Sequence, residues 1–363
     1  IADELEILSD PERGSGVELL LTRLKNSSCR TIGLSAVIGY AERLAEWMDA
    51  RLLRYEQRPV ELRYGVLHDG VFSYRTCNDY SESEEELGEM CGDEATGEVL
   101  VSAIGALVSR GESCLVFVKS KHEARFGARM LAETLSAAPA EKSLQALQGL
   151  ESTVSQELLL ETLQEGVAFH SADLTPEERH IVEQGYRSRE FNVLVSTSTL
   201  AVGMNMPSTN VFISPEKWCY DKRFGMPWKA PILHCEYENM GGRAGRYGSG
   251  MSFGRSILIA GSAYDKETLW QRYIDGEREE IQPRLEPETL ENEILSLVAS
   301  RQCYTENDLQ EFFTQTLTGQ WVWEEQYTLE EVERHVTRAL NRGLDSGTIS
   351  LENGVGTLQA TPW

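Results

Sequence analysis

Residues 236–248, EYENMGGRAGRYG, combine two arginines with four glycines, which suits the binding of an anion close to the backbone. Glycine allows the chain to approach a neighbour closely, and arginine offers a fixed fork of donors that matches phosphate or carboxylate. If the chain is helical from Ala244 onward, Arg243 and Arg246 lie at i and i+3 and share one face. The spacing predicts an anion-binding pair. The alternative is a turn with two solvated arginines.

A second candidate site follows a strand that is expected to be buried. FNVLVS, residues 191–196, runs into TSTLAVGMNMPS, which supplies Thr197, Thr199, Gly203 and Asn205 before a proline. In open α/β folds ligands bind beyond the carboxyl ends of the strands, where small polar groups and backbone donors are accessible. The segment therefore indicates a binding site, with an ordinary strand-to-turn transition as the alternative.

Between these two segments lies PEKWCYDKRFGMPWKAP, residues 215–231, in which cations alternate with aromatic rings. Cations bind phosphate and aromatic faces stack on bases, so the stretch is a candidate nucleic-acid site. An exposed hairpin with packed aromatics is the alternative. The cations are Lys217, Lys222, Arg223 and Lys229, and the rings are Trp218, Tyr220, Phe224 and Trp228.

The composition limits the class of protein. The 363 residues include 58 acidic and 34 basic ones, for a formal net charge of −24. Any basic surface that binds nucleic acid must therefore be a local patch. The seven cysteines include no C-x-x-C pair, so neither a zinc knuckle nor a disulfide framework is indicated, and we expect no structural metal. No apolar run approaches the roughly 20 residues needed to span a bilayer, so we expect a cytoplasmic protein.

The first residues resemble the end of a buried strand. In IADELEIL two apolar residues precede two carboxylates, Asp3 and Glu4, as at the carboxyl edge of a sheet. A strand needs about five residues and only two are present. We therefore expect a fragment whose upstream part is missing.

Strands and helices alternate along most of the chain, which predicts an α/β fold with parallel sheets. Residues 77–98 are acidic and contain glycine, which indicates a linker or a solvated loop. From residue 284 onward three helices and a hairpin indicate a winged helix. Strands are expected at 30–38, 59–67, 113–118, 167–169, 191–196, 211–213 and 256–260, and helices at 17–25, 39–49, 99–109, 121–135, 141–165, 175–187, 288–300, 305–317 and 328–343.

The order of several segments resembles that of superfamily-two DExH helicases. The likeness is greatest to the branch of the archaeal repair helicases, HelQ and the helicase part of polymerase theta, and it covers nearly the whole chain. It implies tandem RecA-like lobes: residues 1–76 in an incomplete first lobe, a linker at 77–98, a second lobe at 99–283 and a winged helix at 284–363. The segments are DELEILSDPERG, IGLSAVIGYAERLAEWMDARLL, RPVELRYGVL, CLVFVKSKHEA, GVAFHSADLTPEERHIVEQGYRS, VLVSTSTLAVGMNMP, EYENMGGRAGR and LWQRYIDGE.

The resemblance implies ATP and Mg²⁺ as cofactors. Hydrolysis of ATP needs a metal, a group that orients the attacking water and cations on the developing charge. Asp3 matches the residue that holds Mg²⁺ through water, and Glu4 matches the one that aligns the attacking water. Arg243 and Arg246 match the arginines that reach the γ-phosphate. Gly203, Asn205 and Asn239 match the positions that line the nucleotide cleft in the family.

The resemblance implies that Thr197 and Thr199 contact the sugar-phosphate backbone of the nucleic acid. The segment 215–231 matches a hairpin that wedges strands apart, with Lys217, Trp218, Lys222, Arg223 and Trp228 as the contacts. The expected partner is DNA, single-stranded or forked. These motifs touch the backbone and do not report the sugar, so an RNA helicase of the same branch stays an alternative.

Several positions depart from the family pattern. Residues 1–363 contain no G-x-x-x-x-G-K-[ST] phosphate loop, so we expect this chain alone not to hydrolyse ATP. A helicase remnant that binds nucleic acid or a protein without turnover is therefore the rival hypothesis. Glu6 replaces His, Val37 replaces Thr, Ser171 and Asp173 replace His and Gly, and Asn239 replaces Gln.

Overall fold

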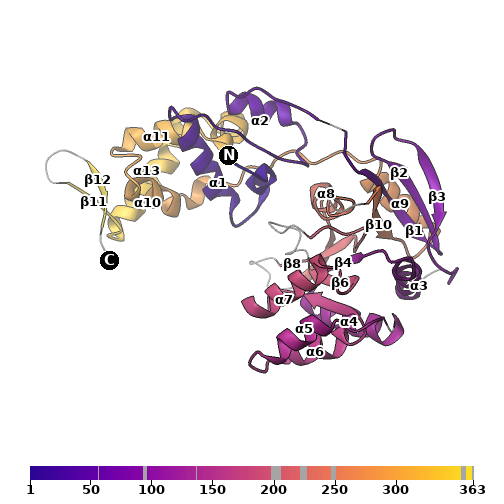
Figure 1. The fold of residues 1–363 in the computed structure, drawn as a ribbon. Coiled ribbons are helices and arrows are strands. Elements are labelled where there is room, and N and C mark those ends of the chain that lie inside the picture. The colour runs from indigo at the N-terminus through magenta and orange to yellow at the C-terminus, as the bar shows by residue number, and fades with distance from the viewer. Residues whose placement is uncertain are drawn as a thin grey trace. The chain divides into compact units, whose positions relative to one another are not determined.

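The computed structural model describes residues 1–55, 57–92, 96–135, 137–197, 206–220, 227–246, 251–352 and 357–361. They form two compact units, Ile1–Arg54 with Arg278–Trp363, and Tyr55–Glu277 (Figure 1). The fold is mixed α/β, as predicted. Within the described ranges, every helix is too short or too polar to cross a lipid bilayer.

The larger unit is built on an eight-stranded sheet in the order β3-β2-β1-β10-β7-β4-β6-β5. All neighbouring strands from β1 to β5 in this order are parallel, whereas β2 and β3 are antiparallel. Its strands are β1 Glu61–His68, β2 Val71–Thr76, β3 Glu82–Glu86, β4 Cys114–Val118, β5 Val167–His170, β6 Val193–Thr197, β7 Asn210–Ile213 and β10 Phe253–Ile259. The helices of this unit are α3 Thr96–Ser109, α4 Lys121–Leu135, α5 Glu141–Gln148, α6 Val154–Leu163, α7 Pro176–Arg187, α8 His234–Gly241 and α9 Ala263–Tyr273.

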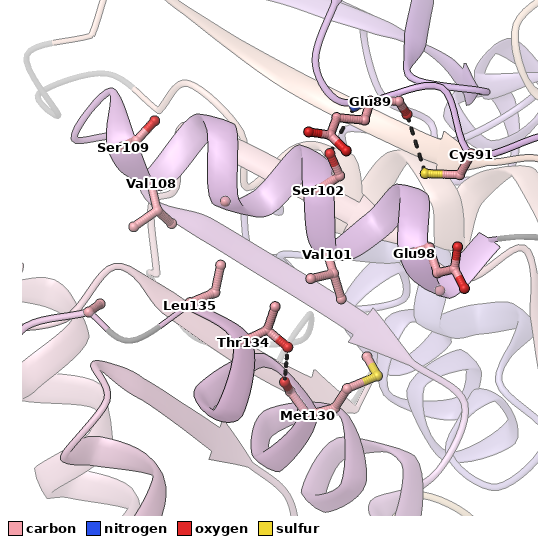
Figure 2. Close-up of a pocket in the computed structure, with 13 residues that line it drawn as sticks. Glu89, Cys91, Glu98, Val101, Ser102, Val108, Ser109, Met130, Thr134 and Leu135 are labelled. Carbon is pink, nitrogen blue, oxygen red and sulfur yellow. Dashed lines mark hydrogen bonds between the residues drawn. The ribbon is translucent and has the colours of Figure 1, made fainter.

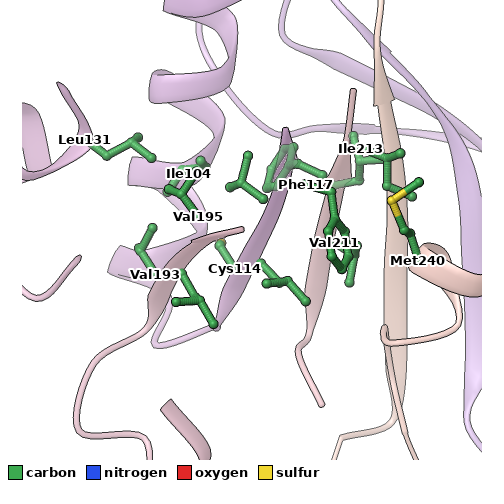
Figure 3. Close-up of a cluster of buried hydrophobic side chains, with 14 of the residues drawn as sticks. Ile104, Cys114, Phe117, Leu131, Val193, Val195, Val211, Ile213 and Met240 are labelled. Atoms are coloured by element: carbon green, nitrogen blue, oxygen red, sulfur yellow. The ribbon is translucent and has the colours of Figure 1, made fainter. Parts of the chain in front are cut away.

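One apolar core joins this sheet to its helices (Figure 3). Val193 and Val195 of β6 and Val211 of β7 are buried, as is Ile104 of α3. Met240 of α8 is buried in the same core, so the helix that precedes the arginine pair is fixed by packing.

Most expected elements of this unit are confirmed. α4 has the expected bounds, and α7 begins where Thr175 accepts a hydrogen bond from the Glu178 amide, with Pro176 in the first turn. The expected helix 141–165 is two helices, α5 and α6, because Thr153 caps a new helix after Gly149. α9 was not predicted.

The expected linker at 77–98 is wrong for Glu82–Glu86, which form the edge strand β3. The charges stay compatible with a strand because an edge strand exposes one face and one hydrogen-bonding edge to solvent. Residues 55–76 belong to the larger unit and not to the first lobe, because β1 pairs with β10 along its length.

The smaller unit is mainly helical. Its later part contains α10, α11 and α13 near the three expected helical stretches, and the hairpin β11–β12 near the chain end. The expected strand at 30–38 is wrong: Gly33 forms an isolated bridge to Ala2, and the rest of 30–38 pairs with no strand among the residues that the structure describes. The elements are η1 Leu5–Ser9, α1 Gly14–Lys25, α2 Ala41–Trp47, η3 Pro287–Thr289, α10 Glu291–Ala299, α11 Glu306–Thr314, η4 Gly319–Trp323, α12 Glu324–Gln326, α13 Leu329–Asp345, β11 Ile349–Leu351 and β12 Leu358–Ala360.

A buried carboxyl group joins α1 to a distant turn of this unit. Glu18 accepts hydrogen bonds from the Thr318 amide at 2.5 Å and from the Thr318 hydroxyl at 2.9 Å. Burial raises the pKa of Glu18 to about 7 from an ordinary value of 4.5, against the opposing effect of these hydrogen bonds. The folded chain therefore holds this proton more tightly than the unfolded chain does.

We expect the stability of the protein to fall as the pH rises from 4.5 to about 7, because ionisation of Glu18 favours the unfolded chain over that range. The slope attributable to this group is at most about 1.4 kcal/mol per pH unit. Urea unfolding at several pH values should give a steeper loss for the wild type than for Glu18→Gln. Identical pH profiles for the two proteins would contradict the assignment.

Candidate functional site

The carboxylates at the chain start lie beside a short parallel bridge. The Ala2 amide donates to the Ile32 carbonyl at 2.8 Å, and Glu4 follows with φ 57°. The Glu4 amide donates to Asp3 Oδ1 at 2.9 Å, which leaves the exposed Asp3 carboxylate a second oxygen that could hold a hydrated Mg²⁺. The described residues contain no group of three or more His, Cys, Asp or Glu suited to a metal.

Glu6, which departs from the family pattern, is hydrogen-bonded to the segment that contains Val37. Its Oε2 accepts a hydrogen bond from the Ser35 hydroxyl at 2.5 Å. The Val37 amide in turn donates to the same hydroxyl at 3.3 Å, and the Val37 side chain is buried. Glu6 therefore connects the acidic segment to the segment at 35–37.

The arginine pair lies on a turn that follows α8 and not on a helix. α8 ends at Gly241 and Gly245 has φ +59°, so the helix considered from Ala244 onward is wrong for residues 244–246. Arg243 is buried at 5% exposure, whereas Arg246 is half-buried with its Nε 3.5 Å from the Gly242 carbonyl. Asn239 is half-buried on α8.

Glycines set this turn against the start of β10. A Cβ on Gly254 would lie 2.3 Å from the Gly245 nitrogen, and Gly245 itself has φ +59°. The Ser208 amide donates to the Arg243 carbonyl at 3.1 Å, and the Gly245 amide donates to the Ser208 carbonyl at 2.9 Å. The glycines are therefore required for close backbone packing, which places the arginines at the amino end of β7.

Arg58 is a further residue of this turn that the sequence reasoning missed. Its Nη2 donates to the Ala244 carbonyl at 3.1 Å, and its backbone amide donates to Asn78 Oδ1 at 2.8 Å. Burial lowers the pKa of the Arg58 guanidinium below its ordinary value. No local pattern reveals this contact, because the two partners are separated by more than half of the chain.

A buried ion network lies on the neighbouring strands. Arg255 is 2% exposed and donates to Glu85 at 2.6 and 2.9 Å, to Glu112 at 2.7 Å and to Asn210 Oδ1 at 2.9 Å. Burial would raise the pKa of Glu85, but Arg255 outweighs it and the pKa falls below its usual range. The network joins β3, β10 and β7 beside the arginine turn.

The carboxyl edge of the sheet carries a different set of groups. Thr197 is buried at the end of β6 and pairs with Val118 at the end of β4. Lys121 forms an ion pair with Asp173, and Arg125 Nη2 lies 3.2 Å from the same carboxylate. Lys121 and Arg125 are cations of this edge that sequence reasoning missed, although both stand in the quoted segments or directly after them.

Two buried polar atoms at this edge have no hydrogen-bond partner within the described ranges, namely His170 Nδ1 and Ser171 Oγ. His170 Nε2 lies 3.3 Å from Glu183 Oε1, and burial lowers the pKa of the imidazole. Buried polar groups are nearly always paired, so such atoms at a sheet edge indicate contact with water or a ligand.

A hairpin lies in the segment expected to contact nucleic acid, formed by β8 Glu216–Tyr220 and β9 Pro227–Pro231. Trp228 is 48% exposed, and Lys229 Nζ lies 5.7 Å from the centre of the Trp218 ring. Lys217 differs from a solvated cation, because its Nζ lies 2.7 Å from both carboxylate oxygens of Glu236. Thr199, Gly203, Asn205, Lys222 and Arg223 lie outside the described residues.

The arginine pair and Thr197 thus lie at opposite ends of the same parallel strands, and Asp3 and Glu4 belong to the other unit. Within the larger unit, the turn at 241–246 carries two guanidinium groups, which are of the chemical type that suits an anion. The carboxyl edge and the hairpin together offer cations, hydroxyls and an aromatic ring, which suits a strand of nucleic acid.

Residues 96–248 match the family described as the helicase conserved C-terminal domain. The chain is 32% identical over 374 residues to the ATP-dependent DNA helicase Hel308 of Caldivirga maquilingensis, over 99% of this chain and 47% of that protein. It is 33% identical over 326 residues to the Hel308 of Pyrobaculum calidifontis, over 87% of this chain and 44% of that protein. The Hel308 of Methanocella arvoryzae is 32% identical over 373 residues, 99% of this chain and 47% of that protein.

The chain spans about half the length of the curated relatives it matches. The likeness extends through both compact units, because the alignments include nearly all of the chain. The chain therefore belongs to the superfamily-two helicases, in the branch of the archaeal repair helicases.

Proposed function

We propose that this chain forms part of an ATP-dependent DNA helicase and supplies a strand-binding surface and two arginines for the nucleotide. The observation that carries the proposal is the glycine-built turn at 241–246, where backbone contacts to Ser208 and β10 hold Arg243 and Arg246 in defined positions. The relatives are named as DNA helicases, which supports DNA as the substrate.

In this proposal Arg243 and Arg246 contact the γ-phosphate of ATP, where cations stabilise the developing charge. Asp3 holds Mg²⁺ through water and Glu4 orients the attacking water. Asn239, half-buried on α8, lies in the same helix-and-turn segment as the arginines and belongs to the nucleotide site. Gly203 and Asn205 complete this site by resemblance.

For the DNA strand, the proposal uses the carboxyl edge and the β8–β9 hairpin. Lys121, Arg125 and Thr197 contact phosphates, and the exposed ring of Trp228 stacks on a base. Trp218 and the cations of the hairpin, including Lys217, Lys222 and Arg223, add to this surface, and Thr199 joins Thr197. Single-stranded or forked DNA fits a surface of this kind.

We also propose that residues 284–363 are a winged helix. Three helices, α10, α11 and α13, share one buried core with the β11–β12 hairpin. This order of elements is the one expected for that motif.

Residues 1–363 alone are expected to show no ATP hydrolysis above background, because no phosphate-loop motif supplies the lysine and amides that hold the β- and γ-phosphates. A coupled ATPase assay on the purified chain measures this directly. Turnover that Glu4→Gln abolishes would contradict the expectation and would place a complete nucleotide site within these residues.

Asp173 is expected to weaken DNA binding, because it forms ion pairs with both Lys121 and Arg125. Asp173→Ala should therefore raise the affinity for single-stranded DNA and steepen the plot of log affinity against log salt by roughly one unit, since each phosphate contact releases a counterion. Fluorescence anisotropy of a labelled oligonucleotide at several salt concentrations gives both quantities.

The matched control is Glu82→Ala, which removes a carboxylate from an ion pair with Arg75 near the opposite edge of the sheet. It should leave the slope unchanged. Trp228→Ala should weaken binding by about 1–3 kcal/mol at an unchanged slope, because stacking releases no counterion. Equal effects of Asp173→Ala and Glu82→Ala would contradict the proposed path of the strand.

A further inference from the structure

A groove of about 770 Å³ lies between α3 and the last turns of α4, away from the residues assigned above (Figure 2). One face of α3 forms one wall of the groove, and the end of α4 forms the opposite wall. The lining residues are Glu89, Cys91, Gly97, Glu98, Val101, Ser102, Gly105, Val108, Ser109, Met130, Thr134, Leu135 and Ala137.

Two glycines of α3 line the groove. Gly97, Val101, Gly105 and Val108 recur at helical spacing and so share one face, over roughly 17 Å of helix axis. A Cβ on Gly97 would meet no atom within 4 Å, so open space lies where a side chain could be. Val101 and Val108 are only partly buried, which leaves apolar surface for a second body to cover.

The polar groups of Ser102, Cys91 and Thr134 already have a backbone partner (Figure 2). The Ser102 hydroxyl accepts from the Glu89 amide at 2.8 Å, and the Cys91 thiol donates to the Glu89 carbonyl at 3.4 Å. The Thr134 hydroxyl donates to the Met130 carbonyl at 2.8 Å. The side-chain groups left to recognise a charged ligand are therefore carboxylates.

These carboxylates make one end of the groove acidic. Glu89 and Glu98 line it, the lining contains no Lys, Arg or His, and neither carboxylate has an ion pair within the part of the chain described. Burial raises the pKa of the Cys91 thiol, and the charges of Glu98, Glu89 and Asp69 raise it further. The potential here is negative, which disfavours nucleic acid and attracts a cation.

We propose that this groove binds an amphipathic helix of a partner protein, with small or apolar residues on one face and Lys or Arg at the end that meets Glu89 and Glu98. A helix fits because the groove is straight along about three turns of α3, and a helix laid in an apolar groove is a recurrent mode of recognition. The positive charge follows from the complementary carboxylates.

The test uses a synthetic helical peptide of about 16 residues made of Ala, Leu and Lys, with the lysines at one end, and a counterpart with Glu in their place. Each is titrated into the 363-residue chain, and methyl NMR signals of Val101, Val108, Met130 and Leu135 are followed. The Lys peptide should shift these signals with saturation. The Glu peptide should not.

Two variants locate the site. Gly97→Leu fills the groove and should abolish the shifts, while unchanged signals of the buried Ile104 and Leu131 confirm that the fold is kept. Glu98→Lys should weaken binding by about tenfold, as expected for reversing one surface charge pair. Glu133→Lys, an exposed position of α4 outside the lining, is the matched control and should bind like the wild type.

Failure of the Lys peptide to bind, equal binding of the Glu peptide, or binding that survives Gly97→Leu would each overturn the proposal. Equal weakening by Glu98→Lys and Glu133→Lys would do the same, because it would indicate attraction to overall charge. None of these results depends on ATP or DNA, so the proposed helicase function is tested separately.

Discussion

Replacing Arg255 by methionine should lower the free energy of unfolding by about 3 kcal/mol, because the change leaves two partly buried carboxylates without their main partner. Glu85 and Glu112 both bind this guanidinium, which is 2% exposed. Arg63 and Arg110, each 3.3 Å from Glu85, remain in the variant and compensate part of the loss. Urea unfolding of the wild type and the variant measures the difference.

Arg129→Met is the matched control for this experiment. Arg129 pairs with Glu161 at 2.7 Å, but both side chains are about half exposed, so the loss should stay below about 1 kcal/mol. Adding Glu112→Gln to Arg255→Met should cost less than the sum of the two single changes, since the carboxylate is already unpaired. Equal losses for Arg255→Met and Arg129→Met would contradict the importance of the buried network.

The central strands and main helices follow from local patterns. The apolar runs at 113–118 and 191–196 are buried on both faces of a parallel sheet, so a continuous apolar sequence is their signature. Thr175 and Pro176 mark the start of α7 through a cap and a preset φ angle. Such signals lie within a few residues of the element they specify.

The acidic strand β3 could not be predicted in this way. Arg63, Arg110 and Arg255 surround Glu85 within the sheet, and each of these partners lies more than 20 residues away in sequence. Without them the run of carboxylates at 82–86 has the composition of a linker. The role of Arg58 could not be predicted for the same reason, because its partner Ala244 is far away in sequence.

The arginine turn was predicted in composition but not in conformation. The spacing of Arg243 and Arg246 is compatible with a helix, yet α8 ends at Gly241. Beyond the helix, Gly245 lies close to Gly254, a contact with a segment that follows the turn. The glycines therefore determine the backbone conformation of the turn, and the arginines are its candidate anion-binding groups.

Gly254→Ala should be the most damaging of the small substitutions near this turn. The new Cβ would lie 2.3 Å from the Gly245 nitrogen and 2.5 Å from the Ala244 carbonyl carbon, so backbone must move on one side or the other. We expect the free energy of unfolding to fall by about 2–3 kcal/mol, the usual cost of overpacking. Gly97→Ala is the control, because its Cβ meets open space and alanine favours the helix.

The displacement should be local to the arginine turn, and hydrogen exchange can locate it. The amides of Ser208 and Gly245 hold the turn through bonds to the Arg243 and Ser208 carbonyls. In Gly254→Ala both amides should exchange faster than the amides of β4 and β6, whose partners are unaffected. Loss of stability with full protection of these two amides would mean that the strain is absorbed elsewhere in β10. The proposed γ-phosphate arginines would then keep their positions, and the glycines could not be what aligns them.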